Sequence, residues 1–289
     1  MHIIMGGTGH VGSAVTSALL ARGEQVAIVT RDAGSAARWH GRGASILEAD
    51  ASNPASLRAA FRRGRRAFLL NPPADTSTDT DMVERHTVAS ILEALQGSGL
   101  EKVVAASTAG AQAGERIGDL NVLWELEQGL QQQPIPAAIQ RGAYYMSNWD
   151  AQLDAARETG QLQAMFPADL AIPMVAPRDL GGFAAERMLS SPDDVALRIV
   201  EGPRRYSAND VAHVLSQLLG REVGVQVTPR HGLRKAFEAL SFSREAAESY
   251  ARMTALSIDA GFAMAADANK GPTTLEEHLR VAMSSRASQ

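Results

Sequence analysis

The sequence contains no cysteine, and this absence removes several kinds of chemistry at once. Disulfide bonds, thiolate metal sites and cysteine nucleophiles are all excluded. The first residues also lack the charged start and the long apolar core of a signal peptide. The composition fits a reducing compartment, and we expect a cytoplasmic protein.

An excess of positive charge and a long apolar run are missing too. The 28 Lys and Arg residues stand against 32 Asp and Glu, for a net charge of −4, whereas nucleic-acid-binding domains carry a basic patch. No stretch approaches the roughly 18 apolar residues that a membrane span needs. The seven histidines show no metal-ligand spacing. We therefore expect no nucleic acid, no membrane and no metal ion as partners.

What the first half of the chain does have is an alternation of short apolar runs and longer helical patterns. The runs are apolar nearly throughout, as strands buried on both faces are. Such alternation predicts an α/β fold, a Rossmann-type doubly wound parallel sheet with helices on both faces. The expected strands are His2–Met5, Gln25–Thr30, Ala44–Glu48, Ala67–Leu70, Lys102–Ser107 and Ala137–Gln140. The expected helices are Val11–Arg22, Ala55–Arg62, Asp81–Gln96 and Leu120–Gln131.

Beyond about residue 150 the alternation loosens. We predict a dinucleotide-binding domain over residues 1–150, which also uses strands near residues 171–200, and a smaller, mainly helical substrate-side lobe over residues 151–289. No low-complexity linker separates them, so the lobe should pack against the first domain. The expected elements are helix Met146–Glu158, strand Ala171–Val175, helix Asp179–Leu189, strand Ala196–Val200, helix Ser207–Leu219, strand Val223–Thr228, and further helices with a polar tail over His231–Gln289.

The most informative segment joins the first strand to the first helix. It reads GGTGHVG and satisfies both Gly-x-x-Gly-x-x-Gly and Gly-x-Gly-x-x-Gly. In such a turn one glycine makes the bend, a second lets the backbone approach a pyrophosphate, and a third lets the helix pack close to the sheet. The helix amides then face the negative charge. We predict that a dinucleotide contacts Gly6, Gly7, Thr8, Gly9, His10, Val11 and Gly12.

Two charged residues after the second strand bear on which dinucleotide binds. Asp32 would favour NAD through its ribose hydroxyls, whereas Arg31 offers a partner for the 2′-phosphate of NADP. Because both are present the choice stays open, and we favour NADP(H) over NAD(H).

Further candidates follow the later strands, at the edge where open α/β sheets bind their ligands. Asp50 is a candidate adenine contact, with capping of the turn before Pro54 as the equal alternative. Asn71 and Pro72 end the fourth strand and leave a cleft lip beside the cofactor. Ser107 ends the fifth strand, where a ligand contact and a structural hydroxyl cap are both open.

Taken in order, these segments resemble the NmrA-like family of atypical short-chain dehydrogenases/reductases. The segments are Gly6–Gly12, Thr30–Asp32, Glu48–Asp50, Leu69–Pro73, Val103–Ser107, Gln140–Gly142 followed by Asn148, Pro177–Gly181, and Gly202-Pro203 with Ser207. The resemblance spans nearly the whole chain and implies an NADP-binding protein. It implies one of two activities: reduction of a quinone, an enone or a similar small molecule, or redox sensing without catalysis through a protein partner.

One catalytic signature of ordinary short-chain dehydrogenases is missing. None of the three lysines lies four residues after a tyrosine, so there is no Tyr-x-x-x-Lys pair in which the lysine lowers the tyrosine pKa. The resemblance also implies a Lys or His four residues before a helix glutamate. Aligned on Glu127, that position holds Leu123. We favour an NADPH-dependent reductase of a quinone, enone or other small carbonyl compound, and keep the non-catalytic NADP(H)-sensing regulator as the alternative.

Aromatic residues after the sixth strand are the candidates for a substrate pocket. Tyr144 and Tyr145 follow Arg141-Gly142 and are placed to line the cleft above the nicotinamide, with Asn148 beside them; packing in the core is the alternative. The candidate catalytic residues are Tyr144, Tyr145 and Ser107. The expected partner is a small-molecule substrate, and a homo-oligomer or a regulatory protein partner stays open.

Overall fold

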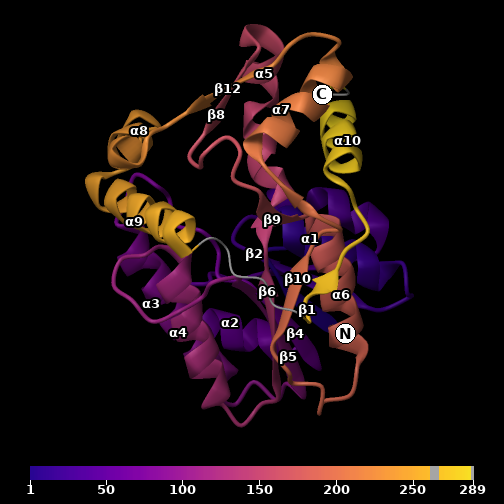
Figure 1. The fold of residues 1–289 in the computed structure, drawn as a ribbon. Helices are drawn as coiled ribbons and strands as arrows, with labels where there is room; N and C mark the ends of the chain where they lie inside the picture. The colour runs from indigo at the N-terminus through magenta and orange to yellow at the C-terminus, as the bar shows by residue number, and fades with distance from the viewer. Residues whose placement is uncertain (261–266, 288–289) are drawn as a thin grey trace.

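A parallel sheet of eight strands forms the centre of the computed structural model, which describes residues 1–260 and 267–287. The strands are β1 (His2–Met5), β2 (Val26–Thr30), β3 (Ser45–Glu48), β4 (Arg66–Leu69), β5 (Lys102–Thr108), β6 (Ala137–Gly142), β10 (Arg198–Glu201) and β13 (Asn269–Lys270). Their spatial order is β13-β10-β6-β5-β4-β1-β2-β3, and all neighbours run parallel (Figure 1). The order reverses between β1 and β4, the place where doubly wound sheets bind ligands. The predicted Rossmann-type fold is confirmed.

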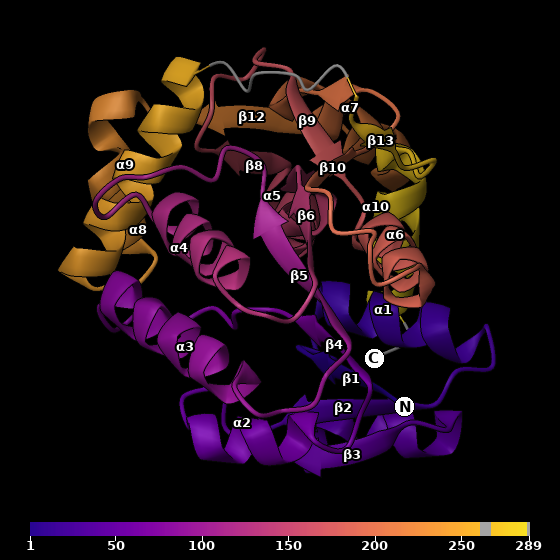
Figure 2. The ribbon, with the colours of Figure 1, turned by 90° about the horizontal axis from the view of Figure 1, so that it is seen from below.

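Helices cover both faces of this sheet, as Figure 2 shows. On one face lie α1 (His10–Leu20) and α6 (Pro177–Leu189), and on the other lie α2 (Pro54–Phe61), α3 (Thr80–Leu95) and α4 (Asp119–Gln131). Side chains of one strand alternate between the two layers: Ile4 packs toward α1 and α6, and Ile3 toward α2 and α3. Both layers are apolar, which explains why these strands read as unbroken hydrophobic runs.

The two helices on the first face approach each other closely. A Cβ on Gly181 of α6 would lie 2.5 Å from the backbone carbon of Ala14 in α1, so only glycine fits at this crossing. Since α6 comes from the second half of the chain, this contact fixes the second half against the glycine turn that begins α1.

The second half also builds a smaller lobe with its own core. It contains the strands β7 (Tyr144–Tyr145), β8 (Gln161–Ala164), β9 (Ile172–Val175), β11 (Arg205–Tyr206) and β12 (Gly224–Val227), and the helices η2 (Met146–Gln152), α5 (Leu153–Thr159), α7 (Ala208–Leu219) and α10 (Leu275–Ala287). These strands form a three-stranded sheet, β11-β9-β7, and a pair, β12-β8. Ser207 and Asp210 cap α7 reciprocally, as their spacing predicts.

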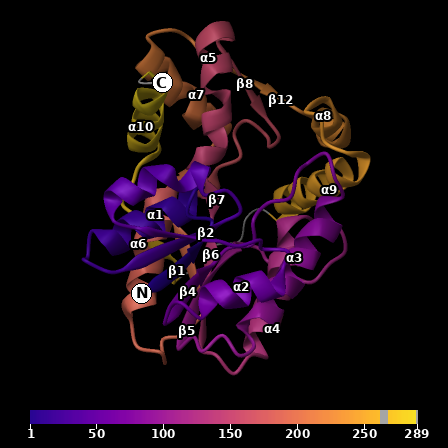
Figure 3. The ribbon, with the colours of Figure 1, turned by 180° about the vertical axis from the view of Figure 1, so that it is seen from behind.

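A helical hairpin stands apart from this lobe. It consists of η3 (Arg230–Gly232), α8 (Leu233–Ala239) and α9 (Arg244–Ala260), and it lies beside α3 and α4 (Figures 1 and 3). Ser243 fastens it to the segment after β4: its N–H donates to the Thr76 carbonyl at 2.8 Å and its hydroxyl to the Thr78 carbonyl at 2.7 Å. The smaller lobe and the helical hairpin, both from the second half of the chain, therefore flank the carboxyl edge of the main sheet.

Several elements differ from the sequence-based expectation. β10 joins the main sheet, but β9 pairs with β7 and β11 in the small sheet instead. The expected helix Met146–Glu158 is divided into the 3₁₀ helix η2 and α5. A 3₁₀ helix, η1 (Gly34–Arg42), and the short strands β7, β8, β11 and β13 were not expected. In the described ranges the helices are all too short or too polar to cross a bilayer.

Candidate cofactor and substrate site

The glycine turn folds back on itself at the start of α1. Gly6 has φ of +67°, in the left-handed region, and its carbonyl accepts the Gly9 N–H at 2.9 Å. A Cβ on Gly12 would lie 2.2 Å from the Gly6 oxygen, so any side chain there would push the turn open. The protein's own backbone therefore requires glycine at positions 6 and 12.

Gly9 is different, because the protein leaves room for a side chain there. Its φ of −89° suits any residue, and a Cβ would meet only the Gly6 oxygen, at 3.5 Å. Gly9 is also the N-cap of α1, where no side chain accepts a hydrogen bond and no acid lies in the first turn. The helix begins with free N–H groups and open space before them, which fits the diphosphate of a dinucleotide.

The other residues of the turn divide by exposure. Gly7 and Val11 are buried, and Thr8 and His10 are exposed. The buried Trp39 of η1 donates its indole N–H to the Gly7 carbonyl at 3.1 Å. Sequence reasoning missed this brace, although the single tryptophan in the basic segment 38–42 was a visible signal.

The segment after β2 and the helix η1 that follows it carry two exposed arginines, and the carboxylate of Asp32 is engaged in a hydrogen bond. Asp32 accepts the Gly34 N–H at 2.8 Å and so stabilises the start of η1. Arg31 is exposed. Arg38, which sequence reasoning also missed, donates to the Thr8 carbonyl at 3.2 Å and lies 5.5 Å from the Trp39 ring centroid. Positive charge thus borders the glycine turn, while the acid is engaged within its own loop.

Asp50 caps a turn. Its carboxylate accepts from the N–H and the hydroxyl of Ser52, at 2.9 and 2.8 Å, and these bonds, aided by the charge of Arg31, hold its pKa below the usual range. The capping alternative is therefore realised, and contact with an adenine stays a prediction.

The segment that follows β4 is held in place by the buried acid Glu84. Asn71 donates its amide to the Glu84 carbonyl at 3.3 Å, and Glu84 accepts the Ala74 N–H at 3.0 Å through Oε1. Glu84 is 3% exposed, and burial, with help from the charges of Asp119 and Asp81, raises its pKa to about 7. The Asn71 side-chain oxygen is buried and has no partner among the described residues, so an acceptor is left over beside Pro72.

A three-residue network ties the ends of β5 and β6 to α4. Ser107 donates its hydroxyl to Glu127 Oε1 at 2.5 Å, and Arg141 binds both carboxylate oxygens, at 2.8 and 2.6 Å. The hydroxyl proton of Ser107 is thereby engaged inside the protein. A catalytic or cofactor-binding role for Ser107 stays a prediction. Leu123 packs against the adjoining hydrophobic core.

The two tyrosines after β6 separate into different surroundings. The Tyr144 ring meets Phe166 edge-on, with centroids 5.6 Å apart, and its hydroxyl bonds to Asn148. Tyr145 packs over the end of β6, where a Cβ on Gly142 would lie 3.0 Å from its ring. Burial raises the pKa of both hydroxyls to about 12. Tyr144 thus belongs to the lobe's aromatic packing, while Tyr145 packs against the core that contains Ile4 and Val11.

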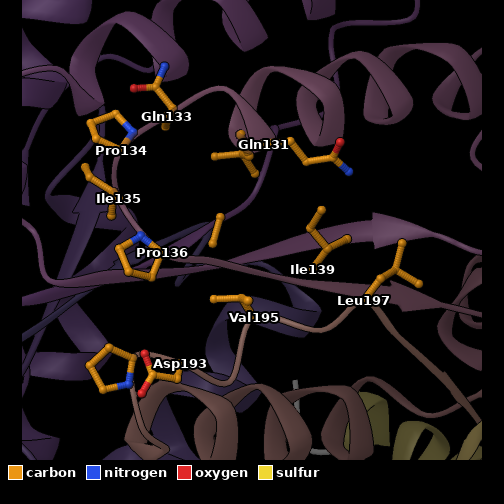
Figure 4. Close-up of a pocket in the computed structure, with 12 residues that line it drawn as sticks. Gln131, Gln133, Pro134, Ile135, Pro136, Ile139, Asp193, Val195 and Leu197 are labelled. Carbon is orange, nitrogen blue, oxygen red and sulfur yellow. The ribbon is translucent and has the colours of Figure 1, made fainter.

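A hollow of about 470 Å³ lies elsewhere, at the amino edge of the sheet (Figure 4). Pro134, Pro136, Val195 and Leu197 are among the residues that line it. These residues belong to the loops that enter β6 and β10, opposite the edge where parallel sheets bind ligands. None of the predicted site residues lines this hollow, so we do not assign the cofactor to it.

The chain is similar to known proteins in sequence and in fold. The model of the NmrA-like family matches residues 2–279. An NAD(P)H azoreductase of Xenophilus azovorans is 23% identical over 256 residues, which cover 89% of this chain and 87% of that protein.

Two solved structures share the fold. The triphenylmethane reductase of Citrobacter sp., in complex with NADP(H), superposes with a TM-score of 0.78 at 21% identity and covers 97% of this chain and 99% of its own. An NADPH-dependent quinone oxidoreductase of Escherichia coli, in complex with NADPH, gives 0.78 at 19% identity, covering 98% and 100%.

Proposed function

The chain belongs to the NmrA-like family, and from that premise we propose that it is an NADPH-dependent reductase of a small conjugated acceptor, a quinone or an enone. The observation that carries the proposal is the N-terminus of α1, which no side chain caps. Its N-cap residue is Gly9, where the backbone conformation and the open space would also admit a side chain. The names of an azoreductase and a quinone oxidoreductase among similar proteins support reduction as the reaction class.

The charges beside the turn favour NADPH over NADH. Arg31 and Arg38 supply cations for a 2′-phosphate, whereas the Asp32 carboxylate, which would select ribose hydroxyls, already accepts a hydrogen bond from Gly34. Replacing both arginines by alanine should raise the Kd for NADPH at least about tenfold and leave that for NADH nearly unchanged, since hydrogen bonds to charged groups contribute about 1.5–3 kcal/mol.

Isothermal titration with each nucleotide measures this difference. Arg22→Ala is the control, because Arg22 follows the opposite end of α1. Equal losses for NADPH and NADH would contradict a 2′-phosphate site.

The chain's residues hold and orient the reactants. When bound, the cofactor supplies a hydride to an electron-poor atom of the acceptor. We assign the diphosphate to the glycine turn and one wall of the substrate site to Tyr145. The unpaired side-chain oxygen of Asn71, in the segment after β4, is available to accept a hydrogen bond from a ligand. With a pKa of about 12, the Tyr145 hydroxyl keeps its proton at neutral pH and orients an acceptor by donating a hydrogen bond.

Turnover tests the proposal directly. NADPH oxidation is followed by absorbance with 2-methyl-1,4-naphthoquinone and with 2-cyclohexenone, and Gly9→Val serves as the binding-deficient control. We expect oxidation by the wild-type chain with at least one acceptor and none by the variant. A wild-type chain that binds NADPH but oxidises it with neither acceptor would overturn the reductase function.

That last outcome would instead favour the regulatory alternative. The observation behind it is that the position of the expected basic residue holds Leu123, which is partly buried and packs against the core. A sensor should retain a protein partner on an immobilised chain with NADP⁺ and release it with NADPH, or the reverse. Partner capture that is the same with both forms would argue against it.

A further inference from the structure

Two neighbouring segments leave the carboxyl edge of the main sheet. The β4 segment, residues 70–79, joins β4 to α3, and the β5 segment, residues 109–118, joins β5 to α4. Because β4 and β5 pair with each other, both segments start at the edge where open α/β sheets hold their ligands. Tyr145, which we assign to a wall of the substrate site, follows the next strand, β6. An acceptor bound at this edge would have the two segments as its neighbours.

The helical hairpin is bonded to both segments. Ser243, directly before α9, donates to the Thr76 and Thr78 carbonyls of the β4 segment. Ser249 of α9 is 0% exposed, and its hydroxyl oxygen accepts the N–H of Gly118, the last residue of the β5 segment, at 3.0 Å. Figures 1 and 3 show the hairpin beside α3 and α4, the helices that the two segments enter. The hairpin therefore holds the two segments from outside the sheet.

The backbone at Gly118 lets α9 come close. Gly118 has φ of +59°, in the left-handed region, and a Cβ there would lie 2.8 Å from the Met253 sulfur of α9. Glycine is therefore needed both for the turn and for the approach of the helix. Alanine in place of Ser249 would leave the Gly118 N–H without this acceptor. A buried donor is costly to leave unpaired, so the segment would shift toward water to satisfy it.

The two segments are also bonded to each other and to the helices they enter. Arg116 of the β5 segment binds the carboxylate of Asp79, the last residue of the β4 segment, at 2.7 Å. Asn121 of α4 accepts the Ile117 N–H at 2.8 Å and donates to the buried Asp81 of α3 at 3.1 Å. The segments and the starts of α3 and α4 thus form one hydrogen-bonded unit, and the hairpin is attached to it at two points.

We propose that Ser249 is a positioning residue of the acceptor site, through which the helical hairpin holds the β5 segment against the acceptor; this rests on the proposed reductase function. Ser249 acts through the Gly118 N–H and touches neither cofactor nor acceptor. The glycine turn follows β1, and β4 separates that strand from β5. The hairpin therefore governs the affinity for the acceptor and leaves that for NADPH unchanged.

Steady-state kinetics with saturating NADPH separate positioning from stability. Ser249→Ala should raise KM for 2-cyclohexenone about tenfold and leave kcat and the Kd for NADPH within about twofold, because it removes ground-state binding of the acceptor. A variant that is only less stable contains fewer folded molecules, which lowers the apparent kcat and leaves KM as it was. Ser249→Thr keeps the acceptor oxygen and should recover part of the affinity. Ser257→Ala is the matched control, because the Ser257 hydroxyl donates to the Met253 carbonyl within α9, at 2.9 Å.

A second measurement needs no turnover. NADP⁺ has no hydride to give, so 2-cyclohexenone and the NADP⁺-loaded chain form an unreactive complex whose Kd isothermal titration measures. This Kd should be about tenfold higher for Ser249→Ala than for the wild type, and Ser257→Ala should match the wild type.

The outcomes separate the two proposals. A wild-type chain that binds the acceptor but does not oxidise NADPH ends the reductase function, and the Kd of Ser249→Ala then decides the role of the hairpin alone. A wild-type chain that turns over, with Ser249→Ala equal to it in KM and Kd, ends only the role of Ser249. Equal losses of acceptor and NADPH affinity in Ser249→Ala would also end that role, because they would show a contact that supports the fold as a whole. A wild-type chain that neither binds nor reduces the acceptor ends both proposals.

Discussion

At the scale of single residues, the polar groups of the site divide into those engaged within the protein and those with capacity left for a ligand. Asp32, Asp50 and Ser107 are engaged in a loop, a turn and a buried network. The Asn71 side-chain oxygen has no partner among the described residues. A ligand is the natural partner for this oxygen, because buried acceptors are seldom left unpaired.

Gly9 and Gly12 should respond in opposite ways to the same substitution. Gly9→Ser gives α1 the hydroxyl cap it lacks, so stability should hold or rise by up to about 1 kcal/mol while NADPH binding is lost. Gly12→Ser forces a side chain into the Gly6 carbonyl and should cost about 3 kcal/mol or more. Urea unfolding and isothermal titration measure the two effects. Tight NADPH binding by Gly9→Ser would refute the placement of the diphosphate.

Sequence could identify the glycines but not their separate reasons. The motif gives the three positions, and only the fold reveals that Gly12 meets backbone whereas Gly9 meets open space. Arg38 and Trp39 were missed for a related reason. Each acquires its importance from contacts with elements distant in the chain, and no local spacing encodes those contacts.

At the scale of elements, the sequence was most informative where a strand is buried on both faces. β1 and β2 were placed within one residue, because buried strands read as continuous apolar runs. β7, β11 and β13 have two residues each, too few for any periodicity. β8 alternates Gln161-Leu162-Gln163-Ala164 over only four residues, which is also too short to stand out.

The crossing of α1 and α6 allows a matched test on adjacent positions. Gly181→Ala should destabilise the protein by about 1–3 kcal/mol, because the new methyl group meets the backbone of α1. Gly182→Ala meets nothing within 4 Å and should stabilise α6 by about 0.5–1 kcal/mol. Thermal unfolding of both variants measures the difference. Similar shifts in the two midpoints would mean that the crossing is looser than described.

The buried acid of α3 should make stability depend on pH. Folding raises the Glu84 pKa from 4.5 to about 7, so the folded chain binds a proton that the unfolded chain releases. Stability from this group is therefore complete below pH 4.5 and is lost as pH rises toward 7, by about 3 kcal/mol in total.

Glu84→Gln isolates this effect, since its amide oxygen can still accept the Ala74 N–H. The variant should match the wild type near pH 4.5 and exceed its stability above pH 7. Chemical unfolding at several pH values measures both chains. A difference between them that does not change with pH would contradict the raised pKa.

At the scale of the whole molecule, the first 150 residues do not form a closed unit. One core joins Ile4 and Val15 of the first half to Leu180, Met188 and Val200 of the second. Strand β10 pairs with β6, and α6 covers α1. The predicted boundary near residue 150 marks where the strand–helix alternation ends, and it stays a prediction. The first domain was also expected to use strands near residues 171–200, and β10 joins its sheet.

A chain truncated after residue 150 should accordingly fail to fold. It would expose the edge of β6 and the apolar face of α1, and lose the burial of several large side chains, each contributing about 1.5–3 kcal/mol. The full chain should unfold in one transition that NADPH moves upward as a whole, because a ligand of the native state stabilises everything coupled to it. Calorimetry of the full chain, and circular dichroism with NADPH titration of the fragment, measure this. A fragment that folds and binds NADPH would mean that the second half supplies only the substrate side of the site.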